Sequence, residues 1–122
     1  APEEKDVEFR YAPNGFCGLE TSLAVMLTDL YHTNVFDLKT IISKMSCEPA
    51  KLFKLAGGTL KEGSVADITI MDLNKEWTVD SSKFYTRGKF TPYEGKACKG
   101  KAVATMLHGN FVMRDGVVCT KK

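Results

Sequence analysis

Long apolar runs and an excess of charge of one sign are both missing from this sequence. Its 122 residues include 17 basic and 15 acidic side chains, for a net charge of +2. No stretch of about 18 apolar residues could cross a membrane as a helix. The basic residues do not cluster, which argues against a nucleic-acid footprint. We therefore expect neither a membrane nor a nucleic acid as a partner.

The start of the chain lacks the features of a secretory signal. Residues 1–6 are polar and acidic, whereas a signal begins with positive charge and continues into an apolar segment. The sequence has no initiating methionine, and its first periodic apolar segment begins only near Leu19. This suggests a processed, cleaved or truncated product, although removal of Met before Ala1 would look the same. We expect a cytoplasmic protein.

Closely spaced cysteines are missing as well. The sequence holds four cysteines, Cys17, Cys47, Cys98 and Cys119. They form no C-x-x-C pair, which argues against a zinc ribbon or a redox motif. Two disulfides agree with the count, but in the absence of a secretory signal we expect reduced thiols that are buried or half-buried.

The composition is that of one globular domain. The first part of the chain is predicted to be a loop followed by a helix. The chain is 43% hydrophobic and 26% charged, which argues against disorder. Proline and glycine punctuate residues 1–18, which we expect to be a long and therefore functional or disordered loop. From Leu19 to Leu30, apolar residues repeat at the spacing of one helix face.

Two further helices are predicted before residue 57. Asp37 is suited to the N-cap of the first, which carries an apolar face of its own. Pro49 suits the first turn of the second, and the Gly57–Gly58 pair would stop it. Residues 1–56 are thus predicted to be a loop and three helices.

Beyond residue 58 the apolar period drops to two, which is typical of strands. The expected strands cover residues 66–71, 77–79, 103–107, 111–113 and 117–118. An irregular excursion over 80–100 interrupts them, and 108–110 form the turn of a predicted hairpin. Helices therefore precede strands, unlike the alternating order of a complete barrel. We expect the apolar helix stripes to need a covering surface beyond these strands.

Two segments resemble motifs of a known enzyme family. Residues 3–5 (E-E-K) and 12–21 (A-P-N-G-F-C-G-L-E-T) resemble the E-E-K … A-P-x-G-x-x-G-x-E-T segment of dihydroorotases. Residues 58–72 resemble the G-x-L-x-x-G-x-x-A-D-I-x-I-x-D segment of many amidohydrolases, hydantoinases and allantoinases included. Residues 49–51 and 91–95 match further family patterns in order. The resemblance, to dihydroorotases of the long bacterial and multifunctional type, covers essentially the whole chain.

The resemblance implies a parent protein of two parts. One is a (β/α)8 barrel with a binuclear zinc site at the C-terminal ends of its strands, and the other is a small β domain built from both termini. Residues 1–56 would end the barrel, with a substrate loop over 1–18, and 57–122 would form the C-terminal part of the small β domain. The expected fold class is an α+β fragment: the last loop and helices of the barrel, then the C-terminal strands of the small β domain.

The resemblance also implies the reaction, which is the reversible cyclisation of N-carbamoyl-L-aspartate to L-dihydroorotate in pyrimidine biosynthesis. In such enzymes zinc polarises a carbonyl and activates a hydroxide. The family's T-D-H-A-P-H metal motif lies directly before E-E-K, where this sequence begins. The two histidines present, His32 and His108, are far apart, and we expect solvated or capping roles for them. No metal ligand and no catalytic residue is therefore expected in this chain, which we expect to be incomplete as a catalyst.

Substrate contact is the one site function that the resemblance assigns to this chain. Active sites of such barrels are built from loops that follow the strands. By resemblance, Asn14 and Gly15 lie where the family loop reaches the substrate through its backbone, beside the substrate carboxylate. Read from the residues alone, 13–15 are an ordinary turn signal. Glu3 and Glu4 are expected to be solvated.

Other acidic and aromatic residues are given structural roles. Glu20 and Thr21 are expected to start a helix, with the carboxylate near its positive end. Asp67 and Asp72 are expected at a turn and a strand end. The scattered aromatic residues are expected to pack in the core or the loops, and they are Trp77, Phe84, Tyr85, Phe90 and Tyr93.

Alternative functions stay open at this point. One is an inactive dihydroorotase-like assembly partner of aspartate transcarbamoylase, and the other is a fragment of an allantoinase or hydantoinase. The expected partners are the substrate pair, the remainder of the barrel or a second copy of the chain, and aspartate transcarbamoylase.

Overall fold

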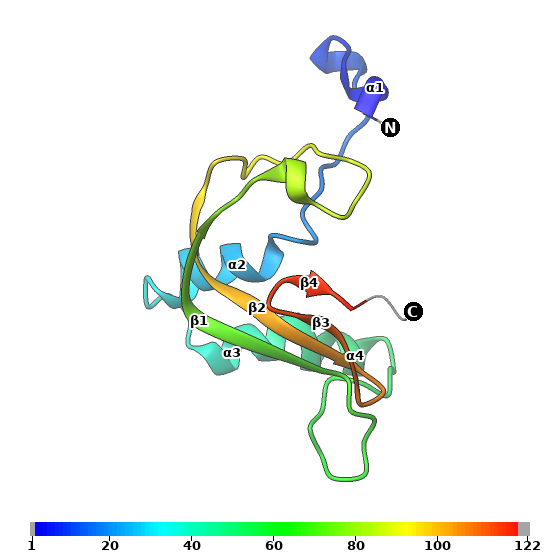
Figure 1. Cartoon of the computed structure of the whole chain (residues 1–122), viewed down its shortest axis with the longest axis vertical. Helices are drawn as coiled ribbons and strands as arrows, with labels where there is room; N and C mark the ends of the chain where they lie inside the picture. Colours follow the sequence, from blue (N-terminus) through cyan, green and yellow to red (C-terminus); the bar gives the residue numbers. More distant parts are fainter. Residues whose placement is uncertain (1, 120–122) are drawn as a thin grey trace.

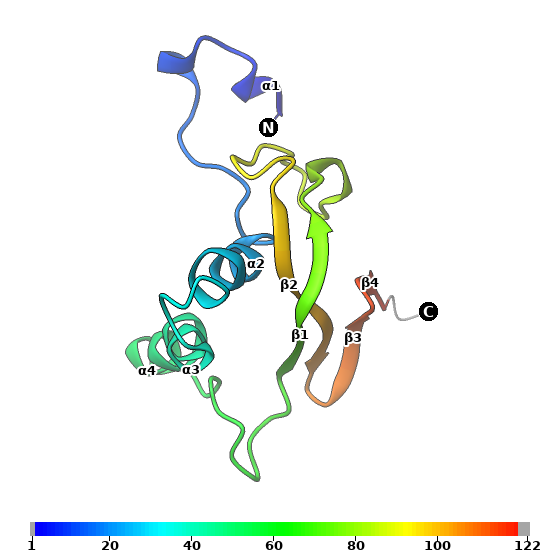
Figure 2. The same ribbon diagram turned by 90° about the vertical axis from the view of Figure 1, so that its left-hand side faces the viewer.

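The computed structural model describes residues 2–119, of which the helices labelled α2, α3 and α4 lie on one side of an antiparallel sheet (Figures 1 and 2). The helical segments of the first part are α1 (Pro2–Lys5), η1 (Phe9–Tyr11), α2 (Ser22–Met26), η2 (Leu27–Tyr31), α3 (Leu38–Ile42), η3 (Ser43–Cys47) and α4 (Glu48–Leu52). They are followed by β1 (Ile68–Thr78), η4 (Ser81–Lys83), β2 (Ala97–Leu107), β3 (Asn110–Arg114) and β4 (Val117–Val118). The predicted order of helices first and strands second is confirmed.

The prediction of a plain loop over residues 1–18 is wrong, because α1 and η1 both lie in it. Pro2 opens α1, with Glu3 and Glu4 in its first turn and Lys5 in its last. Proline fits the first helical position, and acidic residues there are favoured by the helix dipole. These turns extend away from the rest of the molecule (Figure 1).

The first of the three predicted helices, which was expected to begin near Leu19, starts later than predicted. Leu19 is 86% exposed and lies before the helix, whereas Leu27 is fully buried. The reason is a turn at residues 18–21, in which the Thr21 amide and hydroxyl both donate to the Gly18 carbonyl. Thr21 is itself fully buried, so α2 and η2 form one helix whose buried face begins there.

The second and third predicted helices are in fact one continuous helix, α3–η3–α4. Cys47 keeps helical dihedrals, and the π-helical turn η3 leads into the turn that holds Pro49, where a missing amide is tolerated. The predicted N-cap is confirmed, since Asp37 Oδ1 accepts from the Thr40 amide at 2.7 Å. The chain leaves the helix at Lys54, whose φ is +54°, and not at the Gly57–Gly58 pair.

Within residues 2–119 the sheet has four strands in the order β1-β2-β3-β4. The strands predicted at 66–71 and 77–79 are one strand, β1, which stays paired with β2 across an irregularity between Asp72 and Glu76. The Asp72 carboxylate accepts from the amides of Asn74 and Lys75 there. Residues 97–100, expected in the irregular stretch, belong to β2.

The predicted hairpin and last strand are confirmed. β2 pairs antiparallel with β3, and β3 with β4. His108 and Gly109 form the turn with φ values of +48° and +76°, the left-handed backbone that a tight two-residue hairpin requires.

Helix α2–η2 packs against the middle of β2, and this contact forms the core. A Cβ added at Gly100 would lie 2.6 Å from Leu27 Cδ1, so glycine lets the helix approach the strand closely. Thr28 Oγ1 accepts from the Lys99 amide at 2.9 Å, which ties the two elements together. The buried cluster beside this contact consists of Ala24, Val79, Phe84 and Cys98.

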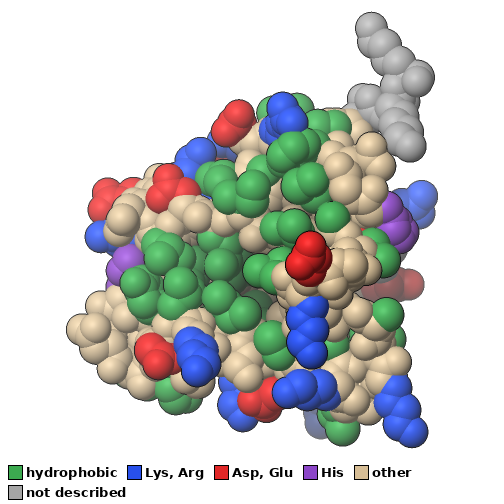
Figure 3. Space-filling model, turned by 90° about the horizontal axis from the view of Figure 1, so that it is seen from below, with side chains coloured by type: hydrophobic (Ala, Val, Ile, Leu, Met, Phe, Trp, Pro, Cys, Tyr) green, Lys and Arg blue, Asp and Glu red, His purple; other side chains and the backbone are tan. Residues whose placement is uncertain are grey.

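An apolar groove of about 560 Å³ separates α3–η3 from β1. Leu23, Ile41 and Met45 line its helical side, and Ile68 and Met71 its sheet side. Figure 3 shows hydrophobic side chains gathered around a hollow on this face. The sheet thus covers the helix stripes only in part, as the sequence predicted. No helix described between residues 2 and 119 is long and apolar enough to span a membrane.

The contact between Leu27 and Gly100 predicts the effect of a methyl group on stability. Gly100 has a φ of +105°, so Gly100→Ala adds backbone strain to an overpacking clash and should lower the free energy of unfolding by about 3 kcal/mol. The matched control is Gly95→Ala, because Gly95 also has a positive φ but open space around it. Strain alone should cost the control about 1 kcal/mol. Urea denaturation of both variants measures the difference, and equal losses would contradict the close contact.

Candidate functional site

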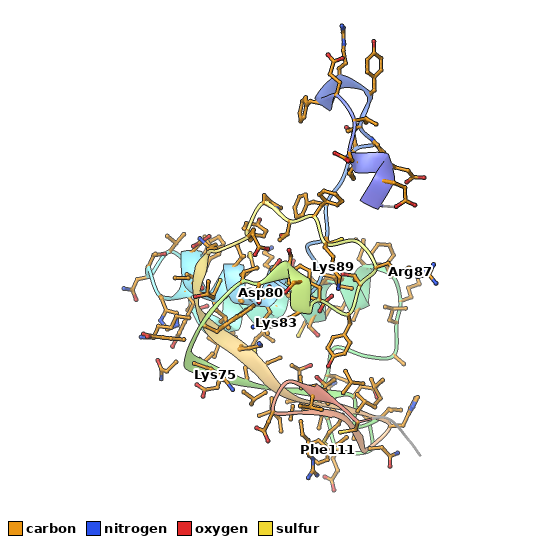
Figure 4. The ribbon with its side chains drawn as sticks, turned by 45° about the horizontal axis from the view of Figure 1, so that its top comes forward. Lys75, Asp80, Lys83, Arg87, Lys89 and Phe111 are labelled. Atoms are coloured by element: carbon orange, nitrogen blue, oxygen red, sulfur yellow. The ribbon has the colours of Figure 1, made fainter. Side chains whose placement is uncertain are left out.

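Asn14 and Gly15 lie at an exposed turn in the segment before α2. Figure 4 shows the N-terminal segment extending from the body. Gly15 has a φ of +94°, in the region that glycine adopts without strain. Among residues 2–119, no acceptor bonds the amide N–H of either residue. The turn therefore presents two backbone donors to solvent, which suits an anionic ligand.

Lys5 closes the segment onto itself. Its ammonium donates to the Pro13 carbonyl and, at 2.8 Å, to the Gly15 carbonyl. The hydrogen bonds link α1 to the turn across eight and ten residues. Glu3 and Glu4 lie on the same short helix and are exposed, as expected from the sequence.

The base of the turn packs on the irregular segment between β1 and β2. The Cys17 amide donates to the Phe90 carbonyl at 2.7 Å, and the rings of Phe16 and Tyr93 meet edge to face at 6.0 Å. A Cβ added at Gly88 would lie 2.7 Å from Cys17 Sγ. Segment 80–96 thus packs against residues 16 and 17 and supports the base of the turn.

Glu20 joins the same segment through its carboxylate. It accepts from the amide of Tyr85 at 3.1 Å, and from the amide and hydroxyl of Thr86 at 3.0 Å each. Partial burial alone would favour the neutral acid, but the bonds from Thr86 and Tyr85 outweigh it and lower the pKa of Glu20. Glu20 and Thr21 lie at the start of α2 as expected, with Thr21 at its N-cap. The Glu20 carboxylate, however, bonds a loop 65 residues away and not the amides of the helix start.

Basic side chains surround this support (Figure 4). Lys89 donates to the Phe84 carbonyl and favours the ionised Glu20. Lys83 forms an ion pair with Asp80 at 2.9 Å, and Arg87 is exposed. The hydrogen bond from Ser82, and then that from Lys83, lowers the pKa of Asp80.

The histidines and acidic residues away from the turn have structural partners. His32 Nε2 lies 2.8 Å from the Leu73 carbonyl, while the side chain of His108 is exposed. Asp67 Oδ1 accepts from the His108 amide at 2.8 Å and holds the hairpin. Between residues 2 and 119, no group of three or more His, Cys, Asp or Glu side chains is placed so that it could hold a metal ion.

The remaining expectations for individual side chains are mostly confirmed. Phe84 is buried, and Trp77 and Tyr93 pack against the same cluster, whereas Tyr85 is 70% exposed. All four cysteines are free thiols, of which Cys98 is buried, Cys17 and Cys47 are half-buried, and Cys119 is exposed.

Sequence analysis missed the residues that hold the turn in place. Lys5 and Glu20 both lie in the family-like motifs, but no local sequence pattern predicts which residues they bond. The available sequence signal for these two residues was the motif, in which a lysine and a glutamate stand at fixed positions relative to the turn.

Residues 14–112 match the model of the amidohydrolase family. A dihydroorotase of Listeria monocytogenes serotype 4a (strain HCC23) is 45% identical over 118 residues, which are 97% of this chain and 28% of that protein. A dihydroorotase of Geobacter sp. (strain M21) is 46% identical over 115 residues, 94% of this chain and 27% of that protein. The chain thus spans little more than a quarter of these relatives, and the predicted resemblance is confirmed.

Solved structures of related proteins superpose on the chain. The L-hydantoinase (dihydropyrimidinase) from Arthrobacter aurescens gives a TM-score of 0.88 at 38% identity, over 93% of this chain and 26% of that one. The dihydropyrimidinase from Brevibacillus agri NCHU1002 gives 0.85 at 25% identity, over 91% of this chain and 24% of that one.

The lowered pKa of Glu20 predicts an acid-sensitive support. Its folded-state pKa is below the ordinary value of 4.5, so its stabilisation is complete above that pH and is lost as pH falls through the folded value. NMR titration of the Thr86 amide shift should therefore show one transition, centred below the ordinary value of 4.5. Glu20→Gln should abolish the transition, and Glu62→Gln, at an exposed loop residue, should leave it intact. A transition that survives Glu20→Gln would contradict the assignment.

Proposed function

The chain belongs to the amidohydrolase family, and from this we propose that it serves in a dihydroorotase. The proposed reaction is the reversible cyclisation of N-carbamoyl-L-aspartate to L-dihydroorotate in cytoplasmic pyrimidine synthesis. Its main support is the identity to proteins named dihydroorotase, 45% over nearly the whole chain. The activity belongs to a protein of the relatives' length, of which these residues are a part.

One observation carries the role of this chain in that reaction. The amides of Asn14 and Gly15 are free of hydrogen-bond partners among residues 2–119, at an exposed turn that is supported from below. Both substrate and product carry carboxylates, and backbone N–H groups bond a carboxylate strongly. We propose that Asn14 and Gly15 bind a substrate carboxylate through these amides.

We further propose how the chain divides within the whole protein. Residues 1–56 would supply the end of a barrel, with 1–18 as its substrate loop, and residues 57–122 part of a small β domain. The change from helices to strands supports this division, since α4 ends at Leu52 and β1 begins at Ile68. The groove between α3–η3 and β1 would face the remainder of the barrel.

The residues described here do not fit a zinc site. His32 contacts a backbone carbonyl across the helix–sheet contact and His108 lies in a hairpin turn, so they share no ligand. Asp67 and Asp72 accept backbone amides. A binuclear zinc centre in the whole protein would therefore take its ligands from outside residues 2–119.

A hydantoinase or dihydropyrimidinase is the second candidate. The superposition on the Arthrobacter L-hydantoinase, with a TM-score of 0.88 at 38% identity, favours it. These substrates are cyclic ureides without the second carboxylate of N-carbamoyl-L-aspartate, so the two candidates differ in the need for a carboxylate-binding turn. A third outcome, assembly with aspartate transcarbamoylase without turnover, would leave both activities absent.

Two grafts, of the same chain into two related enzymes, test the proposed activity. The isolated chain should neither turn over dihydroorotate nor bind stoichiometric zinc, since the described residues hold no ligand set. Residues 1–122 are then placed in the Listeria dihydroorotase and in the Arthrobacter L-hydantoinase, in place of the segments that they match. We expect turnover of dihydroorotate by the first graft and little hydantoin turnover by the second. Activity of the second graft alone would instead support the hydantoinase.

Variants of the turn test substrate contact within the active graft. Gly15→Val should raise KM for N-carbamoyl-L-aspartate about tenfold or more, because a β-branched residue cannot adopt the φ of Gly15 and the amides turn away. Asn14→Ala is the matched control, because it changes the side chain and keeps the amide, so KM should change less than about threefold. Equal KM values for Gly15→Val and the unmodified graft would refute the contact.

A further inference from the structure

We propose that Lys5 is the positioning residue that orients the substrate-binding amide of Asn14 in the turn. This inference rests on the proposed function for the identity of the ligand, but the placement of the turn by Lys5 is independent of it. The carbonyls of Pro13 and Gly15 converge on the one ammonium of Lys5. No other described side chain bonds the backbone between residues 12 and 16.

The geometry of the peptide bond determines in which direction the amides after these carbonyls point. In a trans peptide the C=O and the following N–H point in opposite directions. Because the Pro13 carbonyl is directed at Lys5, the amide of Asn14 is directed away from it. The same holds for the Gly15 carbonyl and the amide of Phe16. Lys5 therefore collects two acceptors on one side and turns the amides of Asn14 and Phe16, the donor edge, to the other. The Asn14 amide on this edge is open to a carboxylate.

The position of the turn makes such a device necessary. The segment extends away from the body, and its contact with segment 80–96 begins only at Phe16 and Cys17 (Figure 4). Gly15 adds freedom, since glycine loses more backbone entropy on ordering than any other residue. A lysine ammonium has three donors, enough to bond both carbonyls. Its charge also lies behind the turn and favours a carboxylate at the donor edge.

NMR of the chain itself tests the placement without any activity. Through-hydrogen-bond couplings from Lys5 Nζ to the carbonyl carbons of Pro13 and Gly15 should be seen. Order parameters of the Asn14 and Gly15 amides should be near about 0.85 and should fall below about 0.6 in Lys5→Met. Lys5→Arg should restore them in part, and Lys61→Met, the same change on an exposed loop, should leave them unchanged. Unaltered order in Lys5→Met would overturn the proposal.

Kinetics of the dihydroorotase graft test what the placement does. Lys5→Met should raise KM for N-carbamoyl-L-aspartate about tenfold with kcat nearly unchanged, because the turn binds ground state and transition state alike. Lys5→Arg should recover most of the loss, which a merely missing packing contact would not. A fall in kcat at constant KM, or no change, would overturn the proposal. Loss of order in Lys5→Met together with an inactive unmodified graft would support the positioning role and refute the proposed function instead.

Discussion

The close approach of a helix to a glycine in the central strand is the contact on which the rest of this structure depends. Leu27 is fully buried against Gly100, and a larger residue on the strand would push the helix away. The approach brings Thr28 within hydrogen-bond reach of the Lys99 amide and Asp29 within 2.9 Å of Lys96. Polar groups are thereby paired at the same place where apolar surface is buried. Because α2–η2 is fixed on β2, the residues that precede the helix are fixed as well.

From this contact a chain of interactions leads outward to the exposed turn. Thr21 is buried at the start of the helix, and Glu20 next to it is tied to the loop at Thr86. Cys17 continues the connection through its bond to Phe90. The connection thus runs from the buried Thr21 to the exposed Gly15, which is the arrangement expected of a binding loop held on a stable scaffold. Burial supports the inner steps, and hydrogen bonds to carbonyls support the outermost one.

Features of the fold and of the site that depend on residues close in sequence could be predicted, and most others could not. The N-cap at Asp37, the hairpin at His108–Gly109 and the order of helices and strands follow from spacing alone, and they were predicted. The continuous helix across Pro49 was not predicted, because the π-helical turn before it accommodates the proline. The single strand β1 was not predicted either, because its pairing with the distant β2 continues across the local break. The partners of Glu20 lie 65 residues away, and no periodicity records such a separation. The turn at Asn14 and Gly15 was identified only through family resemblance, since its residues alone indicate nothing more than a turn.

A structure of the dihydroorotase graft with bound L-dihydroorotate tests the central claim, that this turn binds a substrate carboxylate through its backbone, most directly. We expect the amide nitrogens of Asn14 and Gly15 to lie about 2.9 Å from the ligand carboxylate oxygens, as in charge-assisted hydrogen bonds. A ligand bound in the active site with both amides more than about 4 Å from its carboxylate, beyond the range of a hydrogen bond, would contradict it.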